Sequence, residues 1–152
     1  MIRVGLDTNI LAYLAGVDRG AQDAEKIRRA RDVVAELGKT VWFVVPTQVL
    51  GELFNVLTRT GTSREAAKAI VVRVHDTFEP AAGGAETVMA AVDLAALTQL
   101  QVWDALIVNT AADAGCAVLL TEDMQDGFRW RRLTIVNPLA DQASDRLAVL
   151  LR

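Results

Sequence analysis

Four acidic residues in separate segments are the strongest candidates for chemistry in this sequence. Asp7 follows the apolar run IRVGL, and Asp123 comes shortly after the apolar run CAVLLT. Glu52 lies in a segment with helical periodicity, and Asp104 stands at the beginning of another. Four anions in one cleft repel one another unless cations join them. Oxygen ligands without His or Cys are those that Mg²⁺ and Mn²⁺ prefer, so a fold that gathers these carboxylates would form a metal site.

The segments that must position them alternate between apolar runs and helical patterns. The expected strands are residues 2–6, 41–45, 116–121 and 133–138, with a weaker candidate at 77–80. The expected helices are residues 9–15, 20–38, 46–61, 62–76, 85–100 and 103–115. This alternation predicts a three-layer α/β/α sandwich with a central, mostly parallel sheet of four or five strands. No repeat or linker divides residues 1–152, which we expect to form a single domain.

The predicted sheet explains how distant acidic residues could meet. Ligands of parallel α/β sheets bind beyond the carboxyl ends of the strands. Asp7 and Thr121 stand at two such ends, Glu52 lies on a polar stripe of its helix, and Asp104 stands where the helix dipole favours negative charge. A cation held there could activate water and neutralise a phosphoryl group. The predicted chemistry is therefore metal-dependent phosphodiester hydrolysis.

Each carboxylate also has a structural interpretation. Asp7 and Asp104 are good residues for beginning a helix, and Asp123 lies among turn formers. Glu52 could face solvent on its helix. Its neighbour Gly51 lowers helix propensity and would let another segment approach closely.

Composition limits the remaining possibilities. The chain is 52% hydrophobic and 23% charged with a net charge of −3, which argues against binding nucleic acid through bulk positive charge. No apolar run approaches the roughly 20 residues of a membrane span, so no membrane partner is expected. The single cysteine, Cys116, lies in an apolar run and is expected to be a buried free thiol, which favours the reducing cytoplasm.

An ordered set of motifs resembles a known family. LDTNILAYL, VLGELFNVL, WDALIVNTAADAGC and LLTEDMQDG followed by LTIVNP are similar to the PIN-domain family, and within it to the VapC toxins of prokaryotic toxin–antitoxin pairs. The resemblance covers essentially the whole chain. It implies a PIN-like fold and a metal-dependent endoribonuclease that holds one or two Mg²⁺ or Mn²⁺ ions. It also implies three partners: an RNA substrate, a cognate VapB-like antitoxin and a second copy of the chain.

The resemblance also assigns roles to residues. The acidic quartet that binds the metal is matched by Asp7, Glu52, Asp104 and Asp123. Asn9 and Thr121 match the polar groups that orient these carboxylates, and Asp126 is a further supporting candidate outside the ligand set.

Arginines follow the acidic loop directly. Arg129, Arg131 and Arg132 surround Trp130 in GFRWRRL. Such runs are usually solvated faces, but guanidinium groups beside an aromatic ring also suit phosphate contact and base stacking. We therefore treat the three arginines as candidates that line the RNA path.

Other functions remain open at this stage. A phosphatase with Asp7 as nucleophile usually needs a second Asp two residues later, where this chain has Asn9. A non-catalytic PIN-like scaffold would be expected to lack part of the quartet, and none is missing. A nuclease of RNA processing outside any toxin system remains an alternative. Apolar positions of helices 48–59 and 63–75 are candidates for the dimer surface, and the antitoxin tail would fill the acidic cleft.

Three local expectations concern packing and caps. Trp42, Met89 and Met124 are expected in the core. Thr62 and Glu65 have the spacing of a capping box at the beginning of the fourth helix. His75, the only histidine, is expected at an exposed helix end.

Overall fold

The computed structural model describes residues 1–17, 20 and 23–152. The strands are β1 (Ile2–Leu6), β2 (Val41–Pro46), β3 (Glu79–Ala81), β4 (Cys116–Leu120), β5 (Arg129–Trp130) and β6 (Leu133–Val136). The helices are α1 (Thr8–Leu14), α2 (Asp23–Leu37), α3 (Thr47–Arg59), α4 (Arg64–Thr77), α5 (Ala85–Leu97), α6 (Val102–Asp113) and α7 (Ala143–Leu150). Residues 21–22 of the helix expected at 20–38 lie outside the described residues.

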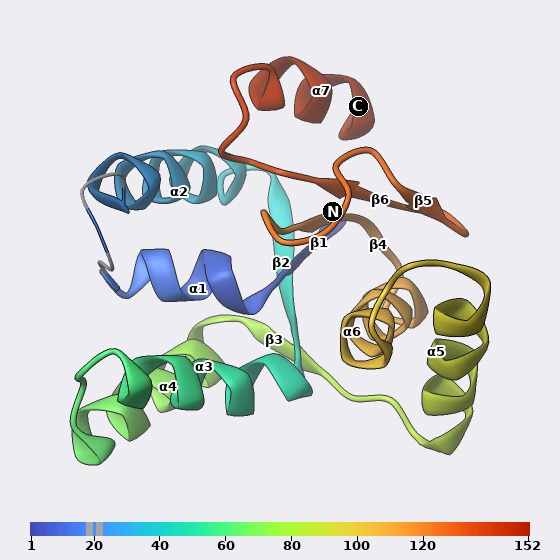
Figure 1. The fold of residues 1–152 in the computed structure, drawn as a ribbon. Helices are drawn as coiled ribbons and strands as arrows, with labels where there is room; N and C mark the ends of the chain where they lie inside the picture. Colours follow the sequence, from blue (N-terminus) through green and yellow to red (C-terminus); the bar gives the residue numbers. More distant parts are fainter. Residues whose placement is uncertain (18–19, 21–22) are drawn as a thin grey trace.

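All six strands form one sheet in the order β3-β2-β1-β4-β6-β5. Every pairing is parallel except that of β5 with β6. In Figure 1, α2 and α7 lie on one side of the sheet and α5 and α6 on the other. The central strands are apolar because helices cover both faces. The α/β/α prediction is confirmed, and the sheet has six described strands where four or five were expected. The additional strand, β5, carries only two residues and has no sequence signal.

The carboxyl ends of β1, β4 and β6 meet at one edge of the sheet. The backbone N–H of Asp7 donates to the carbonyl of Leu120 at 3.1 Å, and that of Thr121 donates to the carbonyl of Val136 at 3.1 Å. The ladder therefore continues one residue beyond β1 and β4. This places the side chains of Asp7 and Thr121 beside each other, where α1 begins.

Close packing fixes α6 against these same strands. A Cβ atom on Gly5, in the middle of β1, would lie 3.0 Å from Leu119 Cδ1 and 3.4 Å from Ala111 Cβ. Glycine at this position and small residues such as Ala105 and Ala111 on α6 let the helix approach the sheet closely. The packing matters for function because α6 carries Asp104.

Several packing expectations were wrong. Trp42 is 51% exposed, and its indole N–H donates to the carboxylate of Glu79. Met89 is 60% exposed on the outer face of α5, whereas Met124 is buried as predicted. The cap of α4 is Ser63, whose hydroxyl accepts from the backbone N–H of Ala66 at 3.2 Å, rather than Thr62.

The last helix was not anticipated by any sequence pattern. α7 packs against the rest of the chain through Ala143 and Leu147, both buried. Cys116 is a buried free thiol and His75 is exposed, both as predicted. None of the described helices has the length and hydrophobicity needed to cross a bilayer.

Candidate metal centre

Asp7 occupies the junction of β1 and α1 and is both a helix cap and a buried carboxylate. Its Oδ1 accepts from the backbone N–H of Thr8 at 2.7 Å, and its Oδ2 accepts from the hydroxyl of Thr121 at 2.8 Å. The residue is only 4% exposed. Burial, together with the negative charges of Asp104 and Asp123, raises the pKa of Asp7 to about 6 despite these hydrogen bonds. The structural and functional interpretations of Asp7 are therefore compatible.

Asn9 and Thr121 connect Asp7 to the acidic loop. The Asn9 amide donates to Asp123 Oδ2 at 3.0 Å and to Thr121 Oγ1 at 3.1 Å, with a longer contact of 3.5 Å to Asp7 Oδ2. Its carbonyl oxygen accepts from the backbone N–H of Glu122 at 3.2 Å. The Thr121 hydroxyl also accepts from the backbone N–H of Asp123 at 3.2 Å. This network orients the carboxylates of Asp7 and Asp123.

Glu52 reaches the same edge from α3. One carboxylate oxygen accepts from the Thr8 hydroxyl at 2.8 Å and the other from the Gln48 amide at 2.8 Å. Gln48 lies one helical turn before Glu52 on the predicted polar stripe. The explanation offered for Gly51 was wrong: a Cβ atom there would meet nothing within 4 Å, so no segment approaches closely.

Asp104 lies close enough to both Glu52 and Asp123 for their negative charges to affect its pKa. It lies in the first turn of α6, whose cap is Gln101. Partial burial and the neighbouring charges of Glu52 and Asp123 raise the pKa of Asp104 above its usual range. In the part of the chain that the structure describes, no ion pair neutralises any of the four carboxylates. Four carboxylates from four segments thus influence one another's protonation, and none of them is paired with a cation of the described residues.

The donor atoms fit a hard divalent cation, although the side chains are not arranged as a finished coordination sphere. Among residues 1–17, 20 and 23–152, no three Asp, Glu, His or Cys side chains converge on a single point. Carboxylate oxygens are nevertheless the ligands that Mg²⁺ and Mn²⁺ prefer. Burial is the main cause of the raised pKa values of Asp7 and Asp104, and a bound cation would favour their charged forms and relieve the additional repulsion between carboxylates.

Asp126 is held away from the quartet. Its carboxylate accepts from the backbone N–H of Asn137 at 2.9 Å and from the guanidinium of Arg146 on α7. Partial burial raises its pKa, but these hydrogen bonds outweigh it and hold the pKa of Asp126 below its usual range. Asp126 therefore links the acidic loop to α7 and contacts none of the four carboxylates.

Two of the three predicted arginines, Arg131 and Arg132, lie away from the acidic loop that precedes them in the sequence, whereas Arg129 is exposed on β5 opposite Thr134. β5 runs antiparallel to β6, so the chain turns back after the acidic loop. Arg131 and Arg132 line a groove with Cys116 at the beginning of β4, and Arg131 pairs with Asp113 at 2.6 Å. The indole N–H of Trp130 donates to Asn109 of α6 at 3.1 Å. The structure separates Arg131 and Arg132 from the quartet, and Trp130 is used in packing.

Sequence reasoning missed three supports of the acidic edge. Gln48 was visible as the residue four positions before Glu52, and Thr8 lies between two predicted residues. Glu122 was visible only as an acidic neighbour of Asp123, and its partners were not predicted: it accepts from the Tyr13 hydroxyl and pairs with Lys26 at 3.2 Å. Glu122 thereby ties the acidic loop to α1 and α2.

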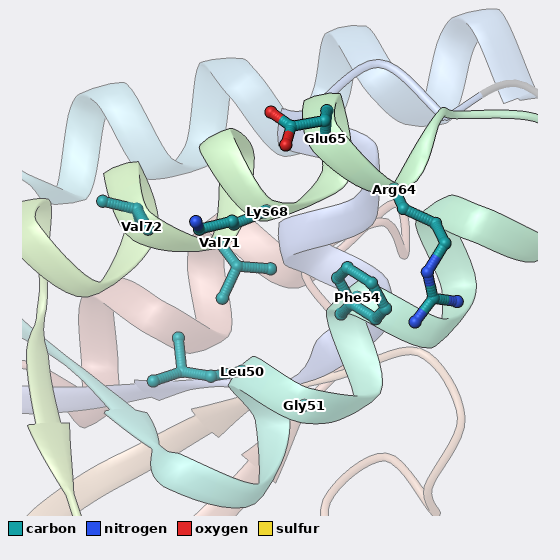
Figure 2. A pocket seen from close by; sticks show the side chains of 8 residues that line it. All are labelled: Leu50, Gly51, Phe54, Arg64, Glu65, Lys68, Val71 and Val72. Carbon is teal, nitrogen blue, oxygen red and sulfur yellow. The ribbon is translucent and has the colours of Figure 1, made fainter.

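A separate groove of about 510 Å³ lies between α3 and α4. Figure 2 shows Leu50, Phe54 and Val71 lining it. The guanidinium of Arg64 lies over the Phe54 ring, 5.1 Å from its centroid. None of the quartet lines this groove, which coincides with the helix faces predicted to form a dimer surface.

The fold and the acidic edge together define an α/β protein with a group of carboxylates beyond the carboxyl ends of a mostly parallel sheet. The sequence matches the PIN domain family over residues 4–129, and the chain belongs to that family. Curated proteins give no match to this sequence.

Solved structures share the fold at low sequence identity. VapBC2 from Rickettsia felis, solved with a DNA fragment from its promoter, has a TM-score of 0.66 and 16% identity, with 88% of this chain and 97% of that chain covered. A toxin–antitoxin complex from Klebsiella pneumoniae has a TM-score of 0.61 and 20% identity, covering 89% and 97%. Mycobacterium tuberculosis VapC20, a toxin that cleaves the sarcin–ricin loop, has a TM-score of 0.58 and 20% identity, covering 76% and 86%.

Proposed function

We propose that this protein is a divalent-metal-dependent endoribonuclease and the toxin of a VapBC-type toxin–antitoxin pair, acting in the cytoplasm as a single-domain PIN protein. The observation that carries the proposal is the group of four carboxylates at the carboxyl edge of a PIN fold. No described ion pair neutralises them, and burial with mutual repulsion raises the pKa of Asp7 to about 6. Such a group is stable at neutral pH when it holds cations.

Asp7, Glu52, Asp104 and Asp123 would hold one or two Mg²⁺ or Mn²⁺ ions. A bound divalent ion supplies an activated water and neutralises charge on the phosphoryl group. Hydrogen bonds from the surrounding residues would hold three of these carboxylates in position to bind a cation. Thr121 and the Thr8 backbone hold Asp7, Asn9 holds Asp123, and Thr8 with Gln48 holds Glu52. Each carboxylate oxygen left without a hydrogen bond remains available to a ligand.

The toxin assignment is supported by the structural neighbours, which are described as VapBC, toxin–antitoxin and VapC proteins. A cognate VapB-like antitoxin is therefore the proposed protein partner, with its tail in the acidic cleft. A second copy of the chain is proposed on the α3–α4 groove of Figure 2, where Leu50, Phe54 and Val71 offer apolar surface. A molar mass of one chain in light scattering would reject the homodimer.

The proposal is tested by cleavage of a mixed RNA substrate with Mg²⁺ or Mn²⁺. We expect EDTA to abolish cleavage and Asp7→Asn to reduce it by about a thousandfold or more, because a bound cation supplies several kcal/mol of transition-state stabilisation. Asn keeps the size of the side chain and removes its charge. Asp93→Asn removes an exposed carboxylate from α5, away from the quartet, and is the control that should cleave like the wild type.

The outcomes separate the alternatives. Cleavage that survives in folded Asp7→Asn protein contradicts the metal-site assignment. No cleavage by the wild type, together with RNA binding, favours a non-catalytic PIN scaffold. Cleavage that no antitoxin encoded beside this chain inhibits favours an RNA-processing nuclease outside a toxin system.

A further inference from the structure

A second hollow opens directly against the acidic site. It has a volume of about 310 Å³ and shares two of its walls, Asp104 and Asp123, with the quartet. Its other walls come from the turn between α5 and α6 and from the loop between β4 and β5. Apart from Asp104 and Asp123, none of the residues that line this groove has a role in the proposed metal site.

Three side-chain amides line the groove: those of Gln99, Gln101 and Gln125. All three residues are exposed, and among the described residues none of these amides makes a hydrogen bond to the protein. Each amide offers two donor hydrogens and an acceptor oxygen. They can therefore hydrogen-bond a ligand without first breaking a contact within the protein.

The remaining walls are apolar, and no wall carries positive charge. Leu100 and Phe128 are half-buried and Met124 is buried. Phosphate groups are bound by cations, and the groove offers none while two carboxylates border it. A nucleobase has the complementary chemistry, with flat apolar faces and an edge of donors and acceptors.

We propose that this groove binds one unstacked nucleobase of single-stranded RNA beside the bond cut at the quartet, and that Gln99, Gln101 and Gln125 determine which base is preferred. This proposal rests on the proposed function. The volume of the groove, about 310 Å³, is at the lower end of the range for ligand pockets and suits a single base. The shared walls place that base within one nucleotide of the carboxylates, so base selection and cleavage are coupled in space.

Cleavage-site sequencing tests the proposal with a pool of single-stranded oligoribonucleotides of random sequence in Mg²⁺ or Mn²⁺. We expect the wild type to prefer one base at a position flanking the cut. Gln101→Ala and Gln125→Ala should weaken that preference by about tenfold, the range of a lost bidentate base contact. Gln142→Ala, at the beginning of α7, removes an equivalent amide that does not line the groove and should leave the preference unchanged. Wild-type cleavage with no base preference would overturn the proposal.

A binding experiment separates this proposal from the proposed function. Adenosine, guanosine, cytidine and uridine carry no phosphate, so they can be titrated into metal-free protein while the side-chain amide resonances of glutamine are followed by NMR. We expect saturable shifts of the Gln99, Gln101 and Gln125 amides with one nucleoside above the others. Ribose alone and the Gln142 amide are the controls.

The two experiments together have distinct failures. Base-selective nucleoside shifts in a protein that cuts no RNA would support the groove and reject the nuclease. RNA cleavage without nucleoside shifts, or equal shifts with ribose, would reject the groove and leave the nuclease standing.

Discussion

The strands that end at the acidic site begin beside a cluster of very different electrostatic character. At their carboxyl ends, Asp7 lies buried among carboxylates and has its pKa raised to about 6. Near their beginnings, Glu79 accepts hydrogen bonds from Arg3 and Trp42, and the bond from Arg3 holds the pKa of Glu79 below its usual value. The negative charge of Glu79, near the beginnings of the strands, is paired with Arg3, whereas the carboxylates around Asp7 at the carboxyl ends have no described ion pair.

This difference in pairing indicates which end of the sheet would gain from binding a cation. A paired carboxylate such as Glu79 is satisfied by its own chain, so a cation from solution gains little there. The carboxylates around Asp7 are oriented by hydroxyl and amide groups that carry no charge. Orientation without neutralisation is what a metal site needs before the metal arrives.

Stability as a function of pH gives the largest effect that distinguishes the two ends. The pKa of Asp7 rises from 3.8 to about 6 on folding, so the folded protein binds this proton more tightly than the unfolded chain. Deprotonation therefore costs the folded state about 3 kcal/mol, a cost absent below pH 3.8 and complete above about pH 6. In EDTA, the free energy of unfolding should increase when the pH is lowered from about 7 to about 5.

Urea unfolding across this pH range measures the effect. Asp7→Asn should reduce the slope and leave the smaller contribution of Asp104, whose pKa is also raised. Glu79→Gln should retain the full slope, because the pKa of Glu79 is lowered and its contribution is lost only in more acidic solution. Mg²⁺ should stabilise the wild type more at about pH 7 than at about pH 5. A wild type in EDTA that becomes less stable over this fall in pH would contradict the comparison.

The hydrogen bonds that orient Asp7 give the next effect. Thr121→Val keeps the shape of a fully buried side chain but removes the hydroxyl shared by Asp7, Asn9 and Asp123. We expect kcat for RNA cleavage to fall by about ten- to a hundredfold, as for other groups that hold metal ligands. The Thr121 hydrogen bond lowers the pKa of Asp7 in the wild type, so its loss should raise that pKa. The acid limb of the pH–rate profile should therefore move to higher pH.

A buried threonine elsewhere provides the control for this variant. Thr134, 7% exposed in β6, has no described side-chain hydrogen bond, so Thr134→Val should retain the wild-type rate and profile. A Thr121→Val protein with wild-type kcat and pH profile would show that the hydroxyl only supports the fold.

The sequence identified the acidic edge because its signals are local. Apolar runs predict strands, and a carboxylate after a run lies at the carboxyl edge of a parallel sheet. Asp7 and Thr121 could be placed from their positions at strand ends, and Glu52 from the polar stripe of its helix. The role of Thr8 was not predicted, because its hydroxyl donates a hydrogen bond to Glu52 of another helix, 44 positions away in the chain.

Several side-chain placements could not be predicted from the sequence, because side-chain partners depend on the packing of distant elements. Asp126 is near Asp123 in sequence, but α7, which no pattern predicted, supplies the arginine that binds it. Trp42 has the residue type of a core position, yet β3 supplies a carboxylate for its N–H and leaves the ring exposed. Two residues of β5 reverse the chain and carry Arg131 away from the acidic loop.

The smallest predicted effect concerns these arginines, which were expected along the RNA path. Arg131 and Arg132 lie near the beginnings of β4 and β6, so RNA reaches them only if it extends around the molecule from the quartet. Arg131→Gln combined with Arg132→Gln should weaken RNA binding a few-fold and reduce the slope of log K against log salt by about 0.7 per lost phosphate contact.

Rate and affinity distinguish the possible results for this double variant. The rate at saturating RNA should stay at the wild-type value, because neither guanidinium lies at the reacting phosphate. Arg28→Gln with Lys39→Gln removes the same charge from residues paired with Glu25 and Glu36, and should leave the salt slope unchanged. An unchanged slope for the Arg131 and Arg132 variant would show that RNA does not reach this end of the sheet. A fall in the saturated rate would instead place these arginines at the reaction, and the contrast between the two ends of the sheet would then be wrong.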